Sequence, residues 1–479
     1  MSLTALRTDG ERWLDARSAA RLQHRLREGL SRARASGAPT LVSVTVAVTG
    51  AVDPSAVVVA SRRPGEPWLC FEQPERDGAA VAALGCVRAL ESQGEERFAR
   101  VAAQWRSLVA SALVETPGGP SGSGLIAVGG FAFAPRGGSS PAWAGFAAGS
   151  LIVPEVSLAR AAGEVWLTLN AEVAPDDTEP DALTRCERRL GELHSAPLPM
   201  VDPAPTGRYD VLSPMPPAHY EEAVARAVQR IRAGELEKIV LAREVDVHAP
   251  VAHDPAAVFG VLREAFASSF VFAVGRGDAA FVGASPELLI RREGQRASTV
   301  ALAGSTRRSA DPAVDDHLGE ALLRSTKDRQ ENAVVARRIE RALAPYAVWV
   351  AAAPEPGLVR MANIQHLGCP IRAQLRAPIG AVELAAVLHP TPAVGAEPEA
   401  ALSLIPALEG VDRGWYAGPV GWTDAGGDGE FCVALRSALL RGPVARCYAG
   451  CGIVRGSDPA AELAESELKL QVMLPALAP

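Results

Sequence analysis

The chain has 479 residues, of which 48% are apolar and 22% are charged, as is ordinary for a globular enzyme. Its net charge of −7 and its lack of a basic run with interleaved aromatic residues argue against a nucleic-acid surface. No stretch approaches the length of a membrane span, and the N-terminus lacks the apolar core of a secretory signal. Seven cysteines without a CxxC motif predict free thiols in a reducing cytoplasm and imply no metal–thiolate site.

The first half of the chain mixes predicted strands and helices. Apolar alternation and β-branched residues predict strands at 41–48, 68–72, 125–133, 151–153 and 165–169. Helical spacing predicts helices over 1–37, 79–93, 95–113 and 183–194. The segment 196–217 holds seven prolines and predicts either a linker or a strap between two packed layers. We therefore expect a β-rich half, residues 1–200, that packs on a catalytic half, residues 215–479, to make one domain.

The second half continues the mixture. Helices are predicted over 219–233, 255–267 and 315–344, from 381, and after 458. Strands are predicted at 237–247, 270–275, 280–283, 288–292, 358–364, 371–375, 420–423, 431–439 and 446–454. No repeat and no dinucleotide-binding or P-loop fingerprint is present. The hairpin-like spacing of the strands favours large antiparallel sheets covered by helices, an α/β (α+β) fold.

Lysine is rare in this sequence. Only Lys238, Lys327 and Lys469 occur among 48 basic residues, as expected from a strong coding bias towards arginine. With such a bias, a lysine is expected mainly where an arginine could not replace it. Such places need either a compact ammonium contact or an amine that can lose its proton. All three lysines lie in the second half, so we expect the chemistry there.

Two residues of this half suit proton transfer. Lys238 lies in the predicted strand GELEKIVLAREV between apolar neighbours, where loss of hydration favours a neutral amine that acts as a base. The alternative is an edge-strand lysine that reaches solvent. Glu287 follows a Ser-Pro turn at the start of an apolar strand, where burial would raise its pKa and make it a general acid. Its alternative is a strand-end glutamate that faces water.

Three glutamates suit a hard cation. Glu462, Glu465 and Lys469 are spaced by three and four residues, which places them on one face of a helix that starts near Asp458. Glu331, on an earlier helix, would complete a carboxylate set for Mg²⁺. The alternative is a pair of solvated acidic faces, with an ordinary ion pair between Glu465 and Lys469. Sequence separation alone does not show that the two helices meet.

Other features suit an anionic ligand. The small-residue turns Ala301–Ser305 and Ala449–Gly452 offer backbone N–H groups to a carboxylate. Arg436 stands in the middle of a predicted apolar strand and needs an anionic partner, from the protein or from a ligand. His366, beside a strand, adds a neutral donor, although a lone histidine is more often structural.

Nine segments stand in an informative order: KIVLAR, GASPELL, LAGS, KDRQEN, QHLG, LHPTPAVG, RGWYAGPVGW, GEFCVALRSA, and AGCGIV followed by ExxExxxK. This order, over about residues 215–475, resembles the chorismate-utilising enzyme family. The segments WLCFEQPE and GGFAFAP extend the resemblance, towards isochorismate synthases of the menaquinone and siderophore type. The resemblance implies a large sandwich of two mostly antiparallel sheets with helices outside and the active site between the sheets.

The resemblance also implies roles. Lys238 resembles the general base that activates water for attack at C2 of chorismate, and Glu287 resembles the general acid that protonates the departing C4 hydroxyl. Glu331, Glu462 and Glu465 match the carboxylates that bind Mg²⁺ in the family. The positions that match substrate-holding ones are Gly304, Tyr416, Arg436, Gly450, Gly452 and Lys469, with His366 and Thr391 as active-site neighbours.

The branch of the family follows from finer resemblances. Ala303 stands where covalent-type aminodeoxychorismate synthases have a lysine, which excludes an amine nucleophile from that position. We expect neither a fused amidotransferase domain nor an amidotransferase subunit, which disfavours anthranilate synthase component I. The segments GWYAGPVGW and GEFCVALRSA resemble the isochorismate branch. We therefore expect a cytoplasmic, monomeric, Mg²⁺-dependent isochorismate synthase that serves menaquinone or siderophore biosynthesis and binds neither nucleic acid nor membrane.

Two alternatives remain open. A salicylate synthase performs the same first step and then eliminates pyruvate, and the pair Tyr416 and Leu435 resembles that branch equally well. A non-catalytic chorismate-binding paralogue would lack the base, the acid or a metal glutamate, and all of them are present. Two positions depart from the family pattern: Asn332 stands where a histidine often follows the metal glutamate, and Ala396 replaces a glycine.

Overall fold

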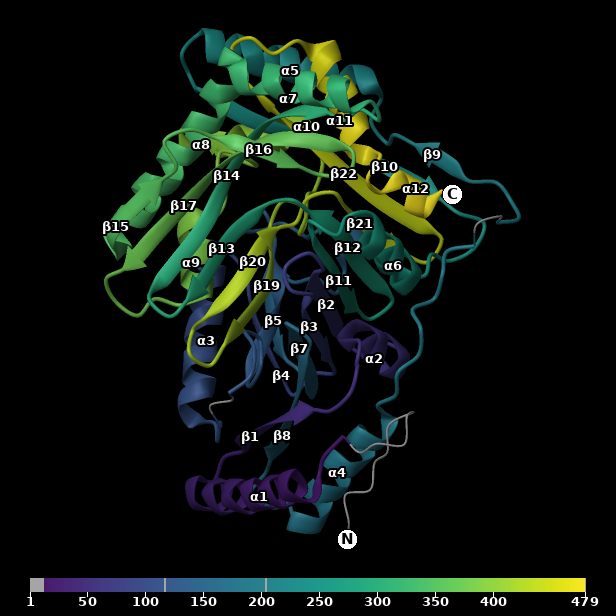
Figure 1. Cartoon of the computed structure of the whole chain (residues 1–479), viewed down its shortest axis with the longest axis vertical. Coiled ribbons are helices and arrows are strands. Elements are labelled where there is room, and N and C mark those ends of the chain that lie inside the picture. The colour runs from purple at the N-terminus through teal and green to yellow at the C-terminus, as the bar shows by residue number, and fades with distance from the viewer. Residues whose placement is uncertain (1–12, 116–117, 203–204, 479) are drawn as a thin grey trace.

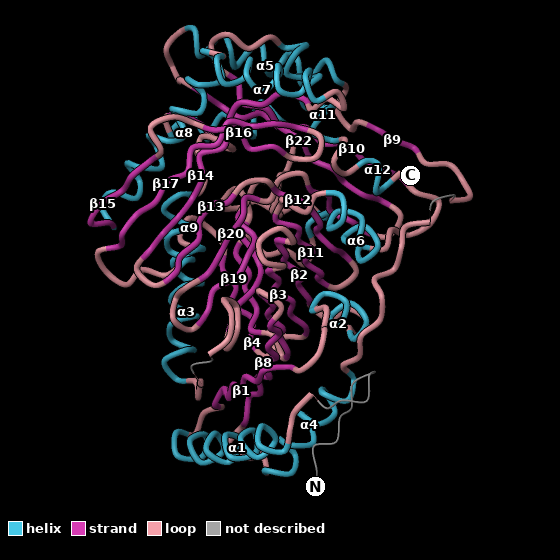
Figure 2. The backbone as a smooth tube through the Cα atoms, viewed as in Figure 1, coloured by secondary structure: helices cyan, strands magenta, loops and turns pink. Residues whose placement is uncertain are grey.

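The computed structural model describes residues 13–115, 118–202 and 205–478. Its strands form two large antiparallel sheets, and the helices lie around them (Figures 1 and 2). This arrangement confirms the predicted fold class. Among the described residues, no helix is both long and apolar enough to cross a membrane.

The first sheet has twelve strands. Its order is β1 (Thr40–Val48), β8 (Glu164–Val173), β7 (Val156–Ala161), β3 (Ala79–Leu84), β2 (Trp68–Gln73), β11 (Phe270–Arg276), β12 (Ala279–Ser285), β21 (Ser437–Arg441), β22 (Val444–Ile453), β10 (Lys238–His248) and β18 (Ala396–Glu397), and β9 (Asp210–Leu212) pairs with β10. Both halves of the chain contribute, and they join where β2 pairs with β11.

The second sheet has ten strands. Its order is β15 (Ala347–Ala352), β17 (Ile364–Leu375), β14 (Arg296–Arg307), β13 (Leu288–Glu293), β20 (Gly429–Val433), β19 (Pro419–Asp424), β5 (Ile126–Phe131), β6 (Gly149–Val153) and β4 (Arg88–Ser92), and β16 (Gly357–Arg360) pairs with β17. The two halves join again, where β19 pairs with β5.

The helices cover the sheets from outside. They are α1 (Ala16–Ser36), α2 (Pro54–Ser61), α3 (Arg97–Ser111), α4 (Glu179–Glu192), α5 (Pro217–Arg232), α6 (Pro255–Ala265), α7 (Pro312–Arg324), α8 (Thr326–Leu343), α9 (Ala381–Leu388), α10 (Ile405–Glu409), α11 (Pro459–Leu470) and α12 (Leu474–Leu477). Helices α1, α2 and α6 pack on the twelve-stranded sheet, and α3, α8 and α9 pack on the ten-stranded sheet. Helices α5 and α11 pack on each other and on β10 and β22, at the upper end in Figure 1.

The apolar core has two parts that match these layers. One cluster joins residues of both sheets, such as Phe71 and Phe431, with residues of the helices on the ten-stranded sheet, such as Val335 of α8. The other packs the twelve-stranded sheet against its outer helices, with residues such as Leu26. Burial on both faces explains why these strands are almost wholly apolar instead of alternating.

The chain changes sheets twice at one place. It leaves the twelve-stranded sheet after β12 and enters the other sheet at β13, through Pro286 and Glu287; it returns between β20 and β21, through Ala434–Arg436. The two crossings touch, because the Val433 N–H donates to the Glu287 carbonyl at 3.0 Å and the Ala284 N–H donates to the Arg436 carbonyl at 3.1 Å.

Four local predictions are wrong. The helix predicted over 79–93 is strands β3 and β4, because pairing with β2, β7 and β6 overrides the helix propensity of the alanines. The helix predicted over 315–344 is broken at Ser325, whose hydroxyl accepts the Asp328 N–H and starts α8. The strand predicted over 431–439 is broken by the second crossing, and the predicted turns at 301–305 and 449–452 lie inside β14 and β22.

Candidate active site

A cavity lies at the two crossings, between the sheets and below α8 and α11. It is lined by all of the residues predicted from sequence except Lys238 and Thr391, namely Glu287, Gly304, Glu331, His366, Tyr416, Arg436, Gly450, Gly452, Glu462, Glu465 and Lys469. The fold thus gathers side chains that are separated by up to 182 positions in the sequence, from Glu287 to Lys469.

Lys238 lies directly behind this lining. Its side chain is only 1% exposed, and its Nζ lies 2.8 Å from Oε1 of Glu331, which does line the cavity. Gly452 lies against this pair at the cavity. A Cβ added there would lie 2.3 Å from the Glu331 Oε1 and 2.8 Å from the Lys238 Cε. Lys238 is therefore a buried lysine beside the cavity, which excludes the solvent-reaching alternative.

Glu287 is held at the first crossing. The residue is 3% exposed, and burial raises the pKa of its carboxyl to about 8, although Lys238, Arg436 and Lys469 oppose the shift. The carboxyl is therefore protonated near neutral pH and can donate a proton into the cavity.

Arg436 is held at the second crossing, with a φ of +49°. Its guanidinium is buried, yet no carboxylate of the described residues pairs with it. Its Nη2 lies 3.5 Å from the His366 Nε2. Burial, together with Arg436 and Lys469, lowers the pKa of His366 to about 3, so the imidazole is neutral and its Nε2 accepts from the guanidinium. A buried cation without a counter-charge is a binding place for an anion.

The two helices do bring the three predicted metal carboxylates together. Each of them pairs with a different lysine, and these are all the lysines of the chain: Lys238 with Glu331 at 2.8 Å, Lys327 with Glu462 at 3.2 Å, and Lys469 with Glu465 at 2.7 Å. The Ser305 hydroxyl also donates to Glu465, at 2.7 Å. The carboxylates are therefore directed inwards and are not solvated helix faces.

This cluster suits a divalent cation. Ligand atoms of Glu462, Glu465 and the Cys451 thiol lie within 4.8 Å of one another. Burial and, to a smaller extent, the neighbouring Glu465 raise the pKa of Glu462. Against the effect of burial, Lys469 and Ser305 hold the pKa of Glu465 at about 2. Carboxylate oxygens are the ligands that Mg²⁺ prefers, so the residues fit the predicted ion.

Glycines keep the cavity open. Gly304 sits at the register shift of β14 with a φ of +82°, and a Cβ there would lie 2.8 Å from the Asp328 Cβ. At Gly450 a Cβ would lie 2.9 Å from the Leu241 carbonyl oxygen and 3.2 Å from the Tyr416 hydroxyl. The Gly450 carbonyl in turn accepts from Lys469 at 2.9 Å.

Thr391 is the predicted residue that the structure places apart from the lining. Its hydroxyl accepts from the Ala393 N–H at 3.3 Å, within its own loop, and Ala393 lines the cavity. Its role next to the site remains a prediction.

Sequence reasoning missed two buried residues that support the site. Arg413 lines the cavity, pairs with Glu409, and donates to the carbonyls of Val240 at 3.0 Å and Val394 at 2.8 Å. It thereby ties the strand of Lys238 to the neighbouring loop, and only its place in the segment RGWYAG pointed to it.

Asn332 is the second missed residue. Its amide donates to the carbonyls of Ala301 at 2.9 Å and Leu367 at 3.0 Å, which fixes β14 against β17 beside the Gly304 bulge. An amide within the apolar face of a helix is the signal that could have pointed to it. The departure from the family pattern at this position is thus a structural tie.

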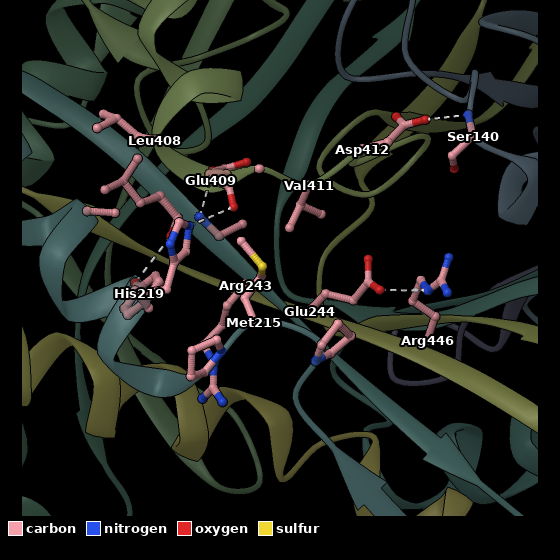
Figure 3. A pocket seen from close by; sticks show the side chains of 17 residues that line it. Ser140, Met215, His219, Arg243, Glu244, Leu408, Glu409, Val411, Asp412 and Arg446 are labelled. Atoms are coloured by element: carbon pink, nitrogen blue, oxygen red, sulfur yellow. Dashed lines mark hydrogen bonds and ion pairs between the residues drawn. The ribbon is translucent and has the colours of Figure 1, made fainter.

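A second pocket, on the other side of β10, lacks these features (Figure 3). Its charged groups engage one another: Glu244 pairs with Arg446 at 2.8 Å, and Asp412 accepts from the Ser140 N–H at 2.9 Å. None of the residues predicted from sequence lines it. The cavity at the crossings is therefore the candidate active site.

Comparisons with known proteins agree with this assignment. A family model described as "Chorismate binding enzyme" matches residues 28–478. The salicylate biosynthesis isochorismate synthase of Pseudomonas aeruginosa is 40% identical over 452 residues, which cover 94% of this chain and 92% of that protein. Isochorismate synthase MenF of Bacillus subtilis is 34% identical, over 85% of this chain and 87% of that protein. The structure of MenF from Escherichia coli matches with a TM-score of 0.76 and 27% identity, over 96% of this chain and 100% of that one.

Proposed function

The chain belongs to the chorismate-binding enzyme family, and we propose that it is an Mg²⁺-dependent isochorismate synthase. The reaction adds water at C2 of chorismate and releases the C4 hydroxyl. The observation that carries the proposal is the presence, at one cavity, of a buried lysine and a buried glutamic acid beside a buried arginine that has no carboxylate partner among the described residues. A base, an acid and an anion-binding cation are what this exchange of hydroxyl groups requires.

Binding comes first in the proposed mechanism. Chorismate carries two carboxylates, and the Arg436 guanidinium offers the uncompensated positive charge to one of them. The neutral His366 accepts from that guanidinium without adding charge, and Gly304 lines the cavity beside it. Tyr416, which stacks on Tyr448 with ring centroids 5.0 Å apart, is a rigid wall for the ring.

Two proton transfers then complete the exchange. Lys238, as the amine, takes a proton from water while the water oxygen bonds to C2, and the ring double bond shifts. The C4–O bond breaks, and its hydroxyl leaves as water with the proton of Glu287. Glu331 stabilises the ammonium that forms on Lys238, since the two side chains already lie 2.8 Å apart. Protons and electrons balance, and no redox partner is needed.

Glu331, Glu462 and Glu465 would hold the magnesium ion. When bound, the ion supplies positive charge to the substrate carboxylate that faces α8 and α11. The residues of the chain supply the rest: Lys469 and Ser305 orient Glu465, and Lys238 orients Glu331.

A salicylate synthase is the second candidate. Leu435 lines the cavity together with Tyr416, the pair that resembles the lyase branch. Incubation of the purified chain with chorismate and Mg²⁺, without ammonia, separates the candidates. Isochorismate as the main product supports the proposal, salicylate with pyruvate assigns the chain to the lyase branch, and anthranilate formed only after ammonia is added contradicts both. The use in menaquinone or siderophore biosynthesis, the cytoplasmic location and the monomeric state remain predictions.

A further inference from the structure

Lys327 is the one lysine for which the proposed mechanism has no role. It is the second residue of α8, where a positive charge faces the positive end of the helix dipole and destabilises the helix. It nevertheless lines the cavity, and its Nζ donates to the Glu462 Oε1 at 3.2 Å. Glu331 and Glu465, the other two proposed metal ligands, line the same cavity as Lys327. Helix stability does not explain this lysine, and the carboxylate cluster does.

Lys327 also differs from the other two lysines in exposure. The side chains of Lys238 and Lys469 are 1% and 10% exposed, whereas that of Lys327 is 45% exposed. Only Lys327 can therefore leave its carboxylate for solvent without burying an unpaired ammonium. A divalent cation that binds Glu462 is attracted by the same negative charge as Lys327, so the two compete for this carboxylate.

We propose that Lys327 is a positioning residue of the carboxylate cluster: its ammonium holds Glu462 until a divalent cation binds, then withdraws to solvent. Lys327 thereby sets the affinity of the cluster for the cation. The inference rests on the proposed magnesium site and deepens it.

The coding bias of the chain supports this role. Arginine is the cation at every other exposed position, so an exposed lysine marks a place where a guanidinium fails. An ammonium on a flexible stem makes a single-point contact and leaves readily, whereas a planar guanidinium binds a carboxylate through two parallel hydrogen bonds. An arginine at 327 would hold Glu462 too firmly for a cation to displace it.

The test measures Mn²⁺ binding by electron paramagnetic resonance, with no chorismate present and with Mn²⁺ standing in for Mg²⁺. Lys327→Met removes the competing charge and is expected to lower the Kd about tenfold or more. Lys327→Arg is expected to raise the Kd by about the same factor. Arg329→Met is the matched control, because Arg329 lies on the same helix with 44% of its side chain exposed but pairs with Glu355; its Kd should equal that of the wild type.

The opposite directions of the two variants exclude a merely structural role, which would weaken binding in both. Weaker or unchanged Mn²⁺ binding by Lys327→Met overturns the inference, and circular dichroism of each variant verifies that it is folded. If neither the wild type nor Lys327→Met binds Mn²⁺, the magnesium site and the inference both fail. If the wild type binds and forms isochorismate but Lys327→Met binds no better, only the inference fails.

Discussion

The two walls of the active-site cavity are charged in opposite ways. On the helix wall, formed by α8 and α11, every predicted metal carboxylate has a lysine Nζ within 3.2 Å. On the crossing wall, Arg436 has no carboxylate partner among the described residues, and its neighbours Glu287 and His366 are both neutral near pH 7. The negative charges of the helix wall are balanced by lysines, so this wall can exchange one cation for another. The second carries a net positive charge that only an anionic ligand can balance.

This difference in charge explains how one cavity can hold both a cation and an anion. A metal site needs ionised carboxylates, and a lysine lies beside each of the three glutamates. An anion site needs a buried cation that is not already neutralised, and at Arg436 the neighbouring acid is protonated while the neighbouring histidine is uncharged. Because each wall comes from different elements, single substitutions can change one wall and leave the other.

The largest loss of activity is expected from a substitution of the proposed base. Lys238→Ala removes the proposed base, and kcat is expected to fall about 10³-fold, within the usual range for loss of a proton-transfer group. Chorismate turnover by the purified variant is the measurement, with circular dichroism as the check on folding. A rate near that of the wild type would remove Lys238 from the mechanism.

Arg436→Met tests the crossing wall. Loss of a buried, charge-assisted contact to the substrate is expected to lower kcat/KM about 100-fold, mainly through KM. Steady-state kinetics with chorismate measure it. Arg441→Met is the matched control, because Arg441 ends β21, the strand that begins directly after Arg436, but pairs with the exposed Asp278. Equal losses in both variants would show that the effect is not one of substrate charge.

Glu465→Gln tests the helix wall. The amide keeps the shape but removes the charge, so the concentration of Mg²⁺ needed for half-maximal activity is expected to rise about tenfold to 30-fold. Activity measured at increasing Mg²⁺ concentrations, with and without EDTA, gives the Mg²⁺ concentration needed for half-maximal activity. The KM for chorismate at saturating Mg²⁺ should change much less, and a larger change in that KM would show that the two walls are not separable.

These walls were only partly predictable from the sequence. Nine ordered segments predicted residues that the structure brings to one cavity, because each proposed role needs a particular side chain in a particular local motif. The geometry at Arg436 was not predictable, since an apolar run with one arginine reads as a continuous strand, and only the pairing of β20 and β21 with different sheets breaks it. The lysine–glutamate pairs were likewise not predictable, because sequence separation does not show that α8, α11 and β10 lie side by side. Arg413 and Asn332 act through backbone carbonyls, for which sequence offers little signal.

The proton that Glu287 carries on the crossing wall predicts that kcat/KM depends on pH. Glu287 must be protonated to act as the acid, and burial raises its pKa to about 8. The acid is therefore in its active form below pH 8, and kcat/KM is expected to fall about tenfold per pH unit above it. A pH–rate profile at saturating Mg²⁺ measures this. Glu287→Gln should retain little activity and show no decline near pH 8, whereas an unchanged decline in that variant would assign it to another group.

The smallest effect is expected in the outer pocket of Figure 3, which shares strand β10 with the active site. His219 lines that pocket, and its Nε2 lies 3.3 Å from the backbone carbonyl of Glu409, whose carboxylate pairs with Arg413. His219→Ala removes this partly buried contact but leaves the Glu409–Arg413 pair, so kcat/KM should stay within about twofold and stability should fall by about 1 kcal/mol. Kinetics and thermal unfolding of the variant measure both. A tenfold loss of activity without a loss of stability would show that the outer pocket is coupled to the cavity through Arg413, and the two pockets would then have to be treated as one site.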